Sequence, residues 1–288
     1  MKKSLIALAV LAASGAAMAQ SSVTLYGIAD AYVGSSKTEV GGVGQRQTAV
    51  NTSGVNGSRW GLKGSEDLGG GMKAIFTLES GFSLDTGASA QNGTLFSRQA
   101  LVGLQSDFGT VSLGRQYSAY DNLQGGTNNN YDAFTFNARN GSGASGGGVA
   151  ANGPILVGYA YQQDKLAGVG AAQDKNKYNL VGGSYDFGVA KLTASYNTAK
   201  NNTLKDKEGQ IGVSVPFGAA AISAGYARSK TEGITGERTG KGYSILGTYA
   251  LSKRTGLYAG AQNTKAHILN AAAETEITTY GLGVRHSF

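Results

Sequence analysis

The chain contains no cysteine and only two prolines in 288 residues, and it has no long apolar run. Without cysteine, neither a disulfide framework nor thiol catalysis is available. Without a run of about twenty apolar residues, the chain offers no helix that could span a bilayer. It is rich instead in glycine (46 residues) and tyrosine (15 residues). This composition is typical of many strands joined by tight turns.

Positive charge is modest and dispersed. The formal net charge is +7, and it falls to +5 (23 basic minus 18 acidic residues) when Lys2 and Lys3 are left out. No basic block indicates nucleic-acid binding. Only His267 and His286 are available as histidine bases, and no activated nucleophile is visible, although the sequence does not exclude a serine–histidine–carboxylate arrangement. We expect no nucleic-acid partner, no enzyme, and neither cofactor nor metal site.

The first nineteen residues have the pattern of an export signal. Lys2 and Lys3 form a charged start, residues 5–13 are apolar, and Ala17-Met18-Ala19 precede Gln20 as a small-residue cleavage site. We expect residues 1–19 to be removed and residues 20–288 to form a single domain outside a bacterial cytoplasm.

Short segments of the mature chain alternate apolar and polar residues. Between residues 23 and 33, Leu25 and Val33 share one face, whereas Tyr26 and Asp30 lie on the other. About fourteen such segments are predicted as strands, with sixteen as the alternative. They are residues 23–33, 58–64, 72–84, 95–105, 110–117, 139–148, 155–163, 178–185, 189–200, 210–215, 219–230, 241–251, 255–266 and 277–288.

The connections favour a membrane barrel over a soluble sandwich. Very short turns such as Asp107-Phe108-Gly109 contain glycine where a positive φ is expected, and they alternate with longer polar connections such as 35–56 and 141–152. Outer-membrane barrels have this arrangement, with apolar faces toward lipid and polar faces toward a lumen. The predicted fold is therefore an all-β, antiparallel transmembrane barrel, with inward polar residues Arg59, Lys63, Glu79, Arg98 and Arg115.

Two segments depart from this pattern. Residues 118–140 are polar, include Gly125-Gly126-Thr127-Asn128-Asn129-Asn130 and show neither strand nor helix periodicity. We interpret them as a functional loop that folds into the barrel and narrows its lumen. Strict alternation also places Ala100, Val102 and Leu104 on the face of Arg98, so this wall is expected to pack against something other than water.

With these strands in place, the chain resembles the general diffusion porins of Gram-negative outer membranes. The resemblance covers nearly the whole mature chain. Its motifs are Ser-Val-Thr-Leu-Tyr-Gly at 22–27, Ser-Arg-Trp-Gly-Leu-Lys-Gly-Ser-Glu-Asp-Leu-Gly at 58–69, Ser-Arg-Gln-Ala at 97–100, Phe-Gly-Thr-Val-Ser-Leu-Gly-Arg-Gln-Tyr at 108–117, Tyr-Ala-Leu-Ser-Lys-Arg-Thr at 249–255, and Gly-Val-Arg-His-Ser-Phe at 283–288.

The resemblance implies a homotrimer of barrels in outer-membrane lipid, usually with sixteen strands and an inward third loop. It implies that Arg59 and Arg98 are wall arginines of the constriction, with Arg139 a third. Arg115 and Tyr117 lie where the fifth strand enters the loop. Phe288 resembles the terminal aromatic signal read by the barrel-assembly machinery.

This chain is shorter than typical members, and its inward loop lacks their acidic segment. The loop offers only Asp121 and Asp132. For these two, the alternative is local hydrogen bonding within the loop. For each arginine, it is a solvated lumen charge or rim pair, and for Tyr26 a place in the barrel wall or its aromatic girdles.

We therefore predict a water-filled channel for passive diffusion of small hydrophilic solutes and ions. Several arginines against few carboxylates leave a positive lumen, which predicts a mild preference for anions. Two alternatives remain open at this point: a structural or adhesive barrel without a through-pore, and a substrate-specific channel that stacks sugars on aromatic residues.

Overall fold

Fifteen strands form one antiparallel sheet in the computed structural model, which describes residues 22–91, 93–127, 143–165, 175–233, 236–268 and 274–288. The strands are β1 (Ser22–Val40), β2 (Val43–Thr52), β3 (Arg59–Gly69), β4 (Met72–Gly81), β5 (Gln99–Ser106), β6 (Gly109–Arg115), β7 (Gly143–Asn152), β8 (Ile155–Lys165), β9 (Lys175–Asp186), β10 (Lys191–Lys200), β11 (Leu204–Phe217), β12 (Ala220–Gly233), β13 (Gly236–Ala250), β14 (Thr255–Ile268) and β15 (Thr275–Ser287). A helix, α2 (Ala119–Thr127), follows β6.

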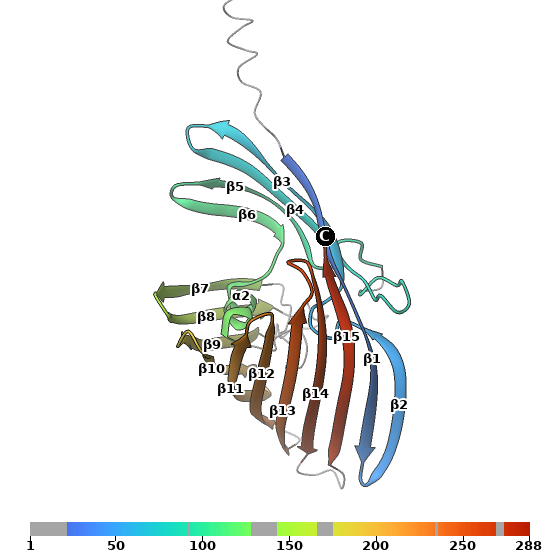
Figure 1. The fold of residues 1–288 in the computed structure, drawn as a ribbon. Coiled ribbons are helices and arrows are strands. Elements are labelled where there is room, and N and C mark those ends of the chain that lie inside the picture. Colours follow the sequence, from blue (N-terminus) through green and yellow to red (C-terminus); the bar gives the residue numbers. More distant parts are fainter. Residues whose placement is uncertain (1–21, 92, 128–142, 166–174, 234–235, 269–273) are drawn as a thin grey trace, which may run out of the picture.

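The order of hydrogen-bonded strands is β6-β5-β4-β3-β1-β15-β14-β13-β12-β11-β10-β9-β8-β7, and β2 pairs with β1 outside this order. The order contains fourteen strands, as the sequence predicted, with β2 as a fifteenth. The sheet curls so that its end strands, β6 and β7, come to the same side of the molecule (Figure 1). Within the described residues these two strands are not hydrogen-bonded to each other, so closure of the cylinder is not seen there.

The sheet is apolar on its outer face and polar inside, which is the reverse of a soluble domain. On β9, Val181 is 49% exposed whereas its neighbour Leu180 is fully buried beneath α2. Ile211 and Ile245 are likewise exposed, while Thr193 and Asn197 are buried on the inner face. Because successive strand residues point to opposite faces, this division follows directly from the period-2 pattern of the sequence.

The short turns lie where the sequence predicted them. Gly109, Gly188 and Gly218 have φ values of 128°, 80° and 62°, so each adopts a conformation that residues with a Cβ rarely reach. The predicted alternation of short turns with long connections is less regular. Where a long connection would be expected, between β10 and β11, only residues 201–203 intervene.

Two segments predicted as loops are strands. Residues 35–56 contain the second half of β1 and all of β2, which pair from Ala31↔Thr52 to Val40↔Val43 as a polar hairpin. Both faces of this hairpin carry polar side chains, so it lacks the alternation that identifies a half-buried strand. Residues 143–152 form β7 and pair with β8, so the strand predicted at 139–148 is confirmed over residues 143–148, and the overlapping loop predicted at 141–152 is wrong over residues 143–152.

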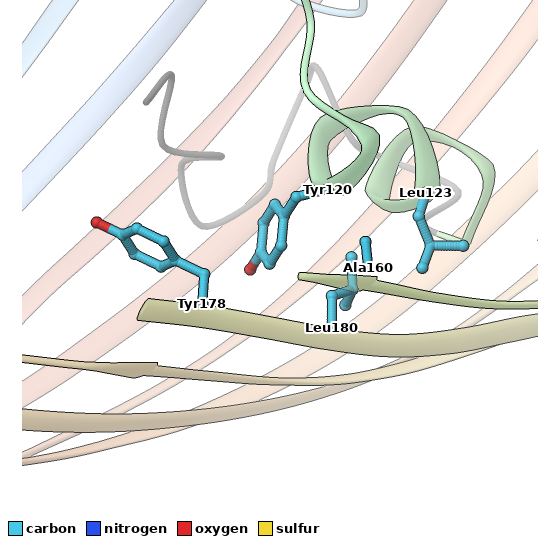
Figure 2. Packing of buried hydrophobic residues seen from close by; sticks show 5 residues of the cluster. All are labelled: Tyr120, Leu123, Ala160, Tyr178 and Leu180. Atoms are coloured by element: carbon cyan, nitrogen blue, oxygen red, sulfur yellow. The ribbon is translucent and has the colours of Figure 1, made fainter. Parts of the chain in front are cut away.

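The helix α2 follows the last residues of β6 and packs on the inner face of the sheet. Tyr120 and Leu123 point from α2 onto Ala160, Tyr178 and Leu180 of β8 and β9 (Figure 2). Residues 118–127 of the predicted inward loop thus lie inside the curled sheet. Among the described residues, no helix combines the length and the apolar character needed to cross a membrane.

Candidate functional site

A cluster of charged and aromatic side chains lies on the inner face of β1, β3, β4 and the residues that flank β5 and β6. Arg59 and Lys63 occupy alternate positions of β3, so both point to the inner face, as the sequence predicted. Gly61 lies between them and pairs with Tyr26 of β1 on one side and Glu79 of β4 on the other. Directly paired residues share a face, so the two strands flanking β3 contribute to the same cluster.

Glu79 is the centre of this cluster. It is only 4% exposed, and Arg98 Nε donates a hydrogen bond of 2.8 Å to Glu79 Oε1. The Tyr26 hydroxyl donates to Oε2 at 2.9 Å, and the Tyr117 hydroxyl donates to Oε1 at 3.4 Å. Charge-assisted hydrogen bonds of this kind are stronger than neutral ones. Glu79 therefore determines where the Arg98 guanidinium lies.

A glycine allows Tyr26 to reach Glu79. The Tyr26 ring passes over Gly61 on the intervening strand, because Tyr26 and Glu79 lie two strands apart. A Cβ at position 61 would lie 2.9 Å from the Tyr26 ring and 2.7 Å from the Leu78 carbonyl oxygen. Any side chain there would displace the tyrosine or the strand.

Two aromatic rings also contact the cations. Lys63 Nζ lies 5.1 Å from the centre of the Tyr26 ring, and Arg98 Cζ lies 5.6 Å from the centre of the Tyr117 ring. Cations are attracted to such ring faces. Arg98 is hydrogen-bonded to Glu79, Lys63 lies over the neighbouring Tyr26 ring, and Arg59 shares their face. These three cations and the Glu79 carboxylate carry a net charge of +2 (three minus one).

Arg98 illustrates where strict alternation misleads. Glu79 pairs with Gln99, so Gln99 faces inward, while Val102 and Leu104 are exposed on the outer face. Arg98 precedes β5 and does not follow its alternation, and its side chain turns inward to Glu79. The expectation that Ala100, Val102 and Leu104 share the face of Arg98 is therefore wrong.

Arg115 lies apart from the Glu79 cluster. It is the last residue of β6, and its Nε donates to the Ser97 carbonyl oxygen at 2.6 Å. Its Nη2 donates to Gln91 Oε1 at 3.2 Å. Both partners belong to the connection between β4 and β5, so Arg115 supports that connection.

Asp121 caps α2. Its Oδ2 accepts hydrogen bonds from the Ser118 backbone N–H at 3.1 Å and from the Ser118 hydroxyl at 2.8 Å, and Ser118 Oγ accepts from the Asp121 N–H. This reciprocal pattern satisfies donors at the helix start. Asp121 is buried, and these contacts are hydrogen bonds within the loop, which is the alternative given above to a role in the constriction. Asp132 and Arg139 lie outside the described residues.

Asp30 points to the inner face but is covered by residues of the β2–β3 connection. Its carboxylate accepts hydrogen bonds from the backbone N–H groups of Gly54, Val55 and Asn56 and from the Tyr258 hydroxyl. It is fully buried, so it anchors this connection to the wall and is not exposed to a lumen.

The β11 strand carries an acidic pair that was not predicted from the sequence. Asp206 and Glu208 face inward, because the exposed Ile211 on the same strand has the opposite parity. The β4 strand is third and β11 tenth in the fourteen-strand order, so a closed cylinder would place them opposite each other. The alternation within Lys205-Asp206-Lys207-Glu208 was the available signal.

Both acids lie close to Tyr120 of α2. Burial raises the pKa of the Tyr120 hydroxyl, and the negative charges of Glu208, Asp121 and Asp206 raise it further. The Tyr120 hydroxyl therefore stays protonated at physiological pH and remains a hydrogen-bond donor.

A family model described as Gram-negative porin matches residues 5–153 and 125–269. Outer membrane porin protein 32 of Delftia acidovorans is 39% identical over 220 residues, which cover 70% of this chain and 61% of that protein. An outer membrane porin protein of Bordetella pertussis is 32% identical over 388 aligned positions, which span 100% of both chains. At least 100 of those positions (388 minus 288) have no residue here.

The fold is also similar to a solved structure, the anion-selective porin from Comamonas acidovorans. The superposition has a TM-score of 0.75 and 26% sequence identity, and it covers 93% of this chain and 100% of that one.

Proposed function

This chain belongs to the Gram-negative porin family, and from that premise we propose that its channel admits small hydrophilic solutes and ions with a preference for anions. The protein is an outer-membrane porin channel of a Gram-negative bacterium and not an enzyme.

The observation that carries the proposal is the net charge of +2 around Glu79. Arg59, Lys63 and Arg98 gather on one inner wall with a single carboxylate among them. A water-filled passage lined by one sign of charge concentrates counter-ions and repels co-ions. The anion selectivity named for the similar Comamonas structure supports the same direction.

The cluster suits weak selection rather than tight binding. Glu79 and the Tyr117 ring contact Arg98, and the Tyr26 ring contacts Lys63, so an arriving anion meets cations that are already in position. A passive channel requires ions to leave as readily as they enter. In water, a unit charge about 7 Å from the ion path contributes roughly 0.6 kcal/mol, or ~2.7-fold in relative occupancy before salt screening.

Reversal potentials in a KCl gradient test the proposal on refolded protein in planar bilayers. We expect chloride to permeate better than potassium in the wild type. The double variant Arg59→Gln/Arg98→Gln should lower the chloride-to-potassium permeability ratio several-fold. The control Lys253→Gln removes the same kind of charge from an exposed turn and should change little.

A wild type that prefers potassium would reject the anion preference. A channel that stays silent in every recording would favour a structural or adhesive barrel. Block of ion flow by sugars at low concentration would instead favour a substrate-specific channel.

We also propose the expected processing and assembly. Residues 1–19 would direct export and be removed, which predicts a mature mass that begins at Gln20. The protein would form a homotrimer, which chemical cross-linking of purified protein would test. The charged start, apolar run and small-residue site of residues 1–19 support the cleavage. Membership of the porin family supports the trimer.

Recognition of Phe288 by the barrel-assembly machinery is a further part of this proposal. The backbone N–H and carbonyl groups of Phe288 and Gly27 exchange hydrogen bonds of 3.1 Å. Phe288 thus pairs with β1, the first strand of the sheet.

A further inference from the structure

A small polar cavity lies between α2 and the inner wall, apart from the Glu79 cluster. Its volume is about 40 Å³, enough for one ion or one or two water molecules and too small for an organic solute. The lining residues are Tyr120, Gln124, Gln162, Tyr178, Asn197, Ala199, Asp206 and Glu208.

Strand register explains why these residues meet. One row across four strands runs Gln162↔Tyr178, Tyr178↔Ala199 and Ala199↔Asp206. The next row runs Ala160↔Leu180, Leu180↔Asn197 and Asn197↔Glu208. These rows form the floor of the cavity. Tyr120 and Gln124 of α2 form its roof, and Tyr120 also packs on Tyr178 with ring centres 6.2 Å apart.

The cavity is rich in oxygen acceptors and carries negative charge. Asp206 and Glu208 are alternate residues of one strand, so both side chains project to the same side from Cα atoms about 7 Å apart. No lining residue is basic. Within the described residues, few hydrogen-bond donors reach the two carboxylates. Thr231 Oγ1 donates to Asp206 Oδ1, and Asn197 Nδ2 donates to Glu208 Oε2 at 3.4 Å.

Gln124 presents an unsatisfied carbonyl oxygen to the cavity. It is only 5% exposed and lines the cavity, yet its carbonyl oxygen Oε1 has no hydrogen-bond donor within the described part of the chain. Buried acceptors are almost always satisfied, so an orphaned carbonyl calls for a cation or a water molecule. Two carboxylates beside it favour the cation.

We propose that this cavity binds one hard divalent cation of the Ca²⁺ class. Calcium prefers carboxylate and amide oxygens and tolerates irregular coordination. Asp206 and Glu208 would balance its charge, and Gln124 Oε1 would coordinate it from α2. The described residues contain no cluster of three His, Cys, Asp or Glu side chains, so the neutral amide oxygen is essential to the site. The cation fastens α2 to the wall, independently of the anion preference proposed above.

Terbium luminescence tests this site on the full mature protein, refolded in non-ionic detergent. Tb³⁺ replaces Ca²⁺ at oxygen sites, and Tyr120 and Tyr178 lie close enough to sensitise its emission. We expect tyrosine-sensitised emission that Ca²⁺ displaces. Glu208→Gln should weaken Tb³⁺ binding roughly tenfold or more, because ligand charge sets calcium affinity. The control Glu232→Gln, in an exposed ion pair on β12, should leave the emission unchanged.

A second measurement separates a lost site from a misfolded variant. Heat-modifiable electrophoretic mobility reports whether Glu208→Gln still forms a barrel. The same assay should show that Ca²⁺ raises the unfolding temperature of the wild type and has no such effect on Glu208→Gln. Absent emission, or equal emission from wild type and Glu208→Gln when both barrels are folded, would overturn the proposal and leave a water molecule as the occupant.

Discussion

At the scale of single residues, Glu79 combines two roles that oppose each other electrically. Its carboxylate holds Arg98, Tyr26 and Tyr117 in position, which organises the positive wall. The same carboxylate subtracts one unit from the charge of that wall. Removing the charge while keeping the shape of the side chain therefore separates the two roles.

We expect Glu79→Gln to increase anion preference. The net charge of the four-residue cluster rises from +2 to +3, whereas the amide oxygen can still accept a hydrogen bond from Tyr26. The chloride-to-potassium permeability ratio from reversal potentials should increase up to ~2.7-fold. Glu66→Gln is the matched control, because Glu66 is exposed near the end of β3. An unchanged or lower ratio in Glu79→Gln would contradict the role of the Glu79 carboxylate in reducing the positive charge of this wall.

At the scale of elements, α2 depends on the wall for its stability. A nine-residue helix is marginal by itself in water, so its capping by Ser118 and Asp121 does not suffice to maintain it. Leu123 is 1% exposed and packs with Tyr120 against Ala160 and Leu180 (Figure 2). This packing decides whether the helix stays at the inner wall.

Leu123→Ala should therefore loosen α2 without unfolding the sheet. Truncating a buried leucine typically costs about 2–5 kcal/mol, a large share of what holds a short helix in place. We expect noisier open-channel current in single-channel recordings and unchanged heat-modifiable mobility. Asn122→Ala alters the exposed face of the same helix and serves as the control. Quiet recordings from Leu123→Ala would show that other contacts hold α2.

At the scale of the whole molecule, the first and last strands are joined in the sheet. The β1 strand pairs with β15 from Ile28↔Ser287 to Val40↔Thr275, and Phe288 continues this pairing onto Gly27. The Phe288 ring covers Gly27, where an added Cβ would lie 2.3 Å from the ring. The final residue therefore extends the pairing of the first and last strands by one position.

We expect Phe288→Ala to slow folding into lipid vesicles and deletion of Phe288 to slow it more. The substitution removes only the ring, whereas the deletion also removes the backbone hydrogen bonds to Gly27. Band-shift electrophoresis over time measures the folded fraction. Phe187→Ala removes an exposed ring from the β9–β10 turn and is the control. Equal folding rates for Phe288→Ala and Phe187→Ala would contradict a special role of the terminal ring.

Local pattern predicted several features correctly. Alternation alone places Tyr26, Arg59, Lys63 and Glu79 on the inner face, because the side of a strand residue depends only on its own position along the strand. Turn chemistry predicted the positive φ of Gly109 and its counterparts. The strand β2 at 43–52 was missed, since a strand with polar side chains on both faces has no alternation to detect.

Period-2 patterning is a local property, so the order of amino acids is enough to specify a sheet with an apolar face and a charged face. Which residues meet across that sheet depends on the fold. Arg98 reaches Glu79, Tyr26 crosses Gly61, and Asp206 and Glu208 lie beneath α2. These contacts depend on register between strands and on the return of a loop to a distant wall, and both are set by packing over long sequence separations.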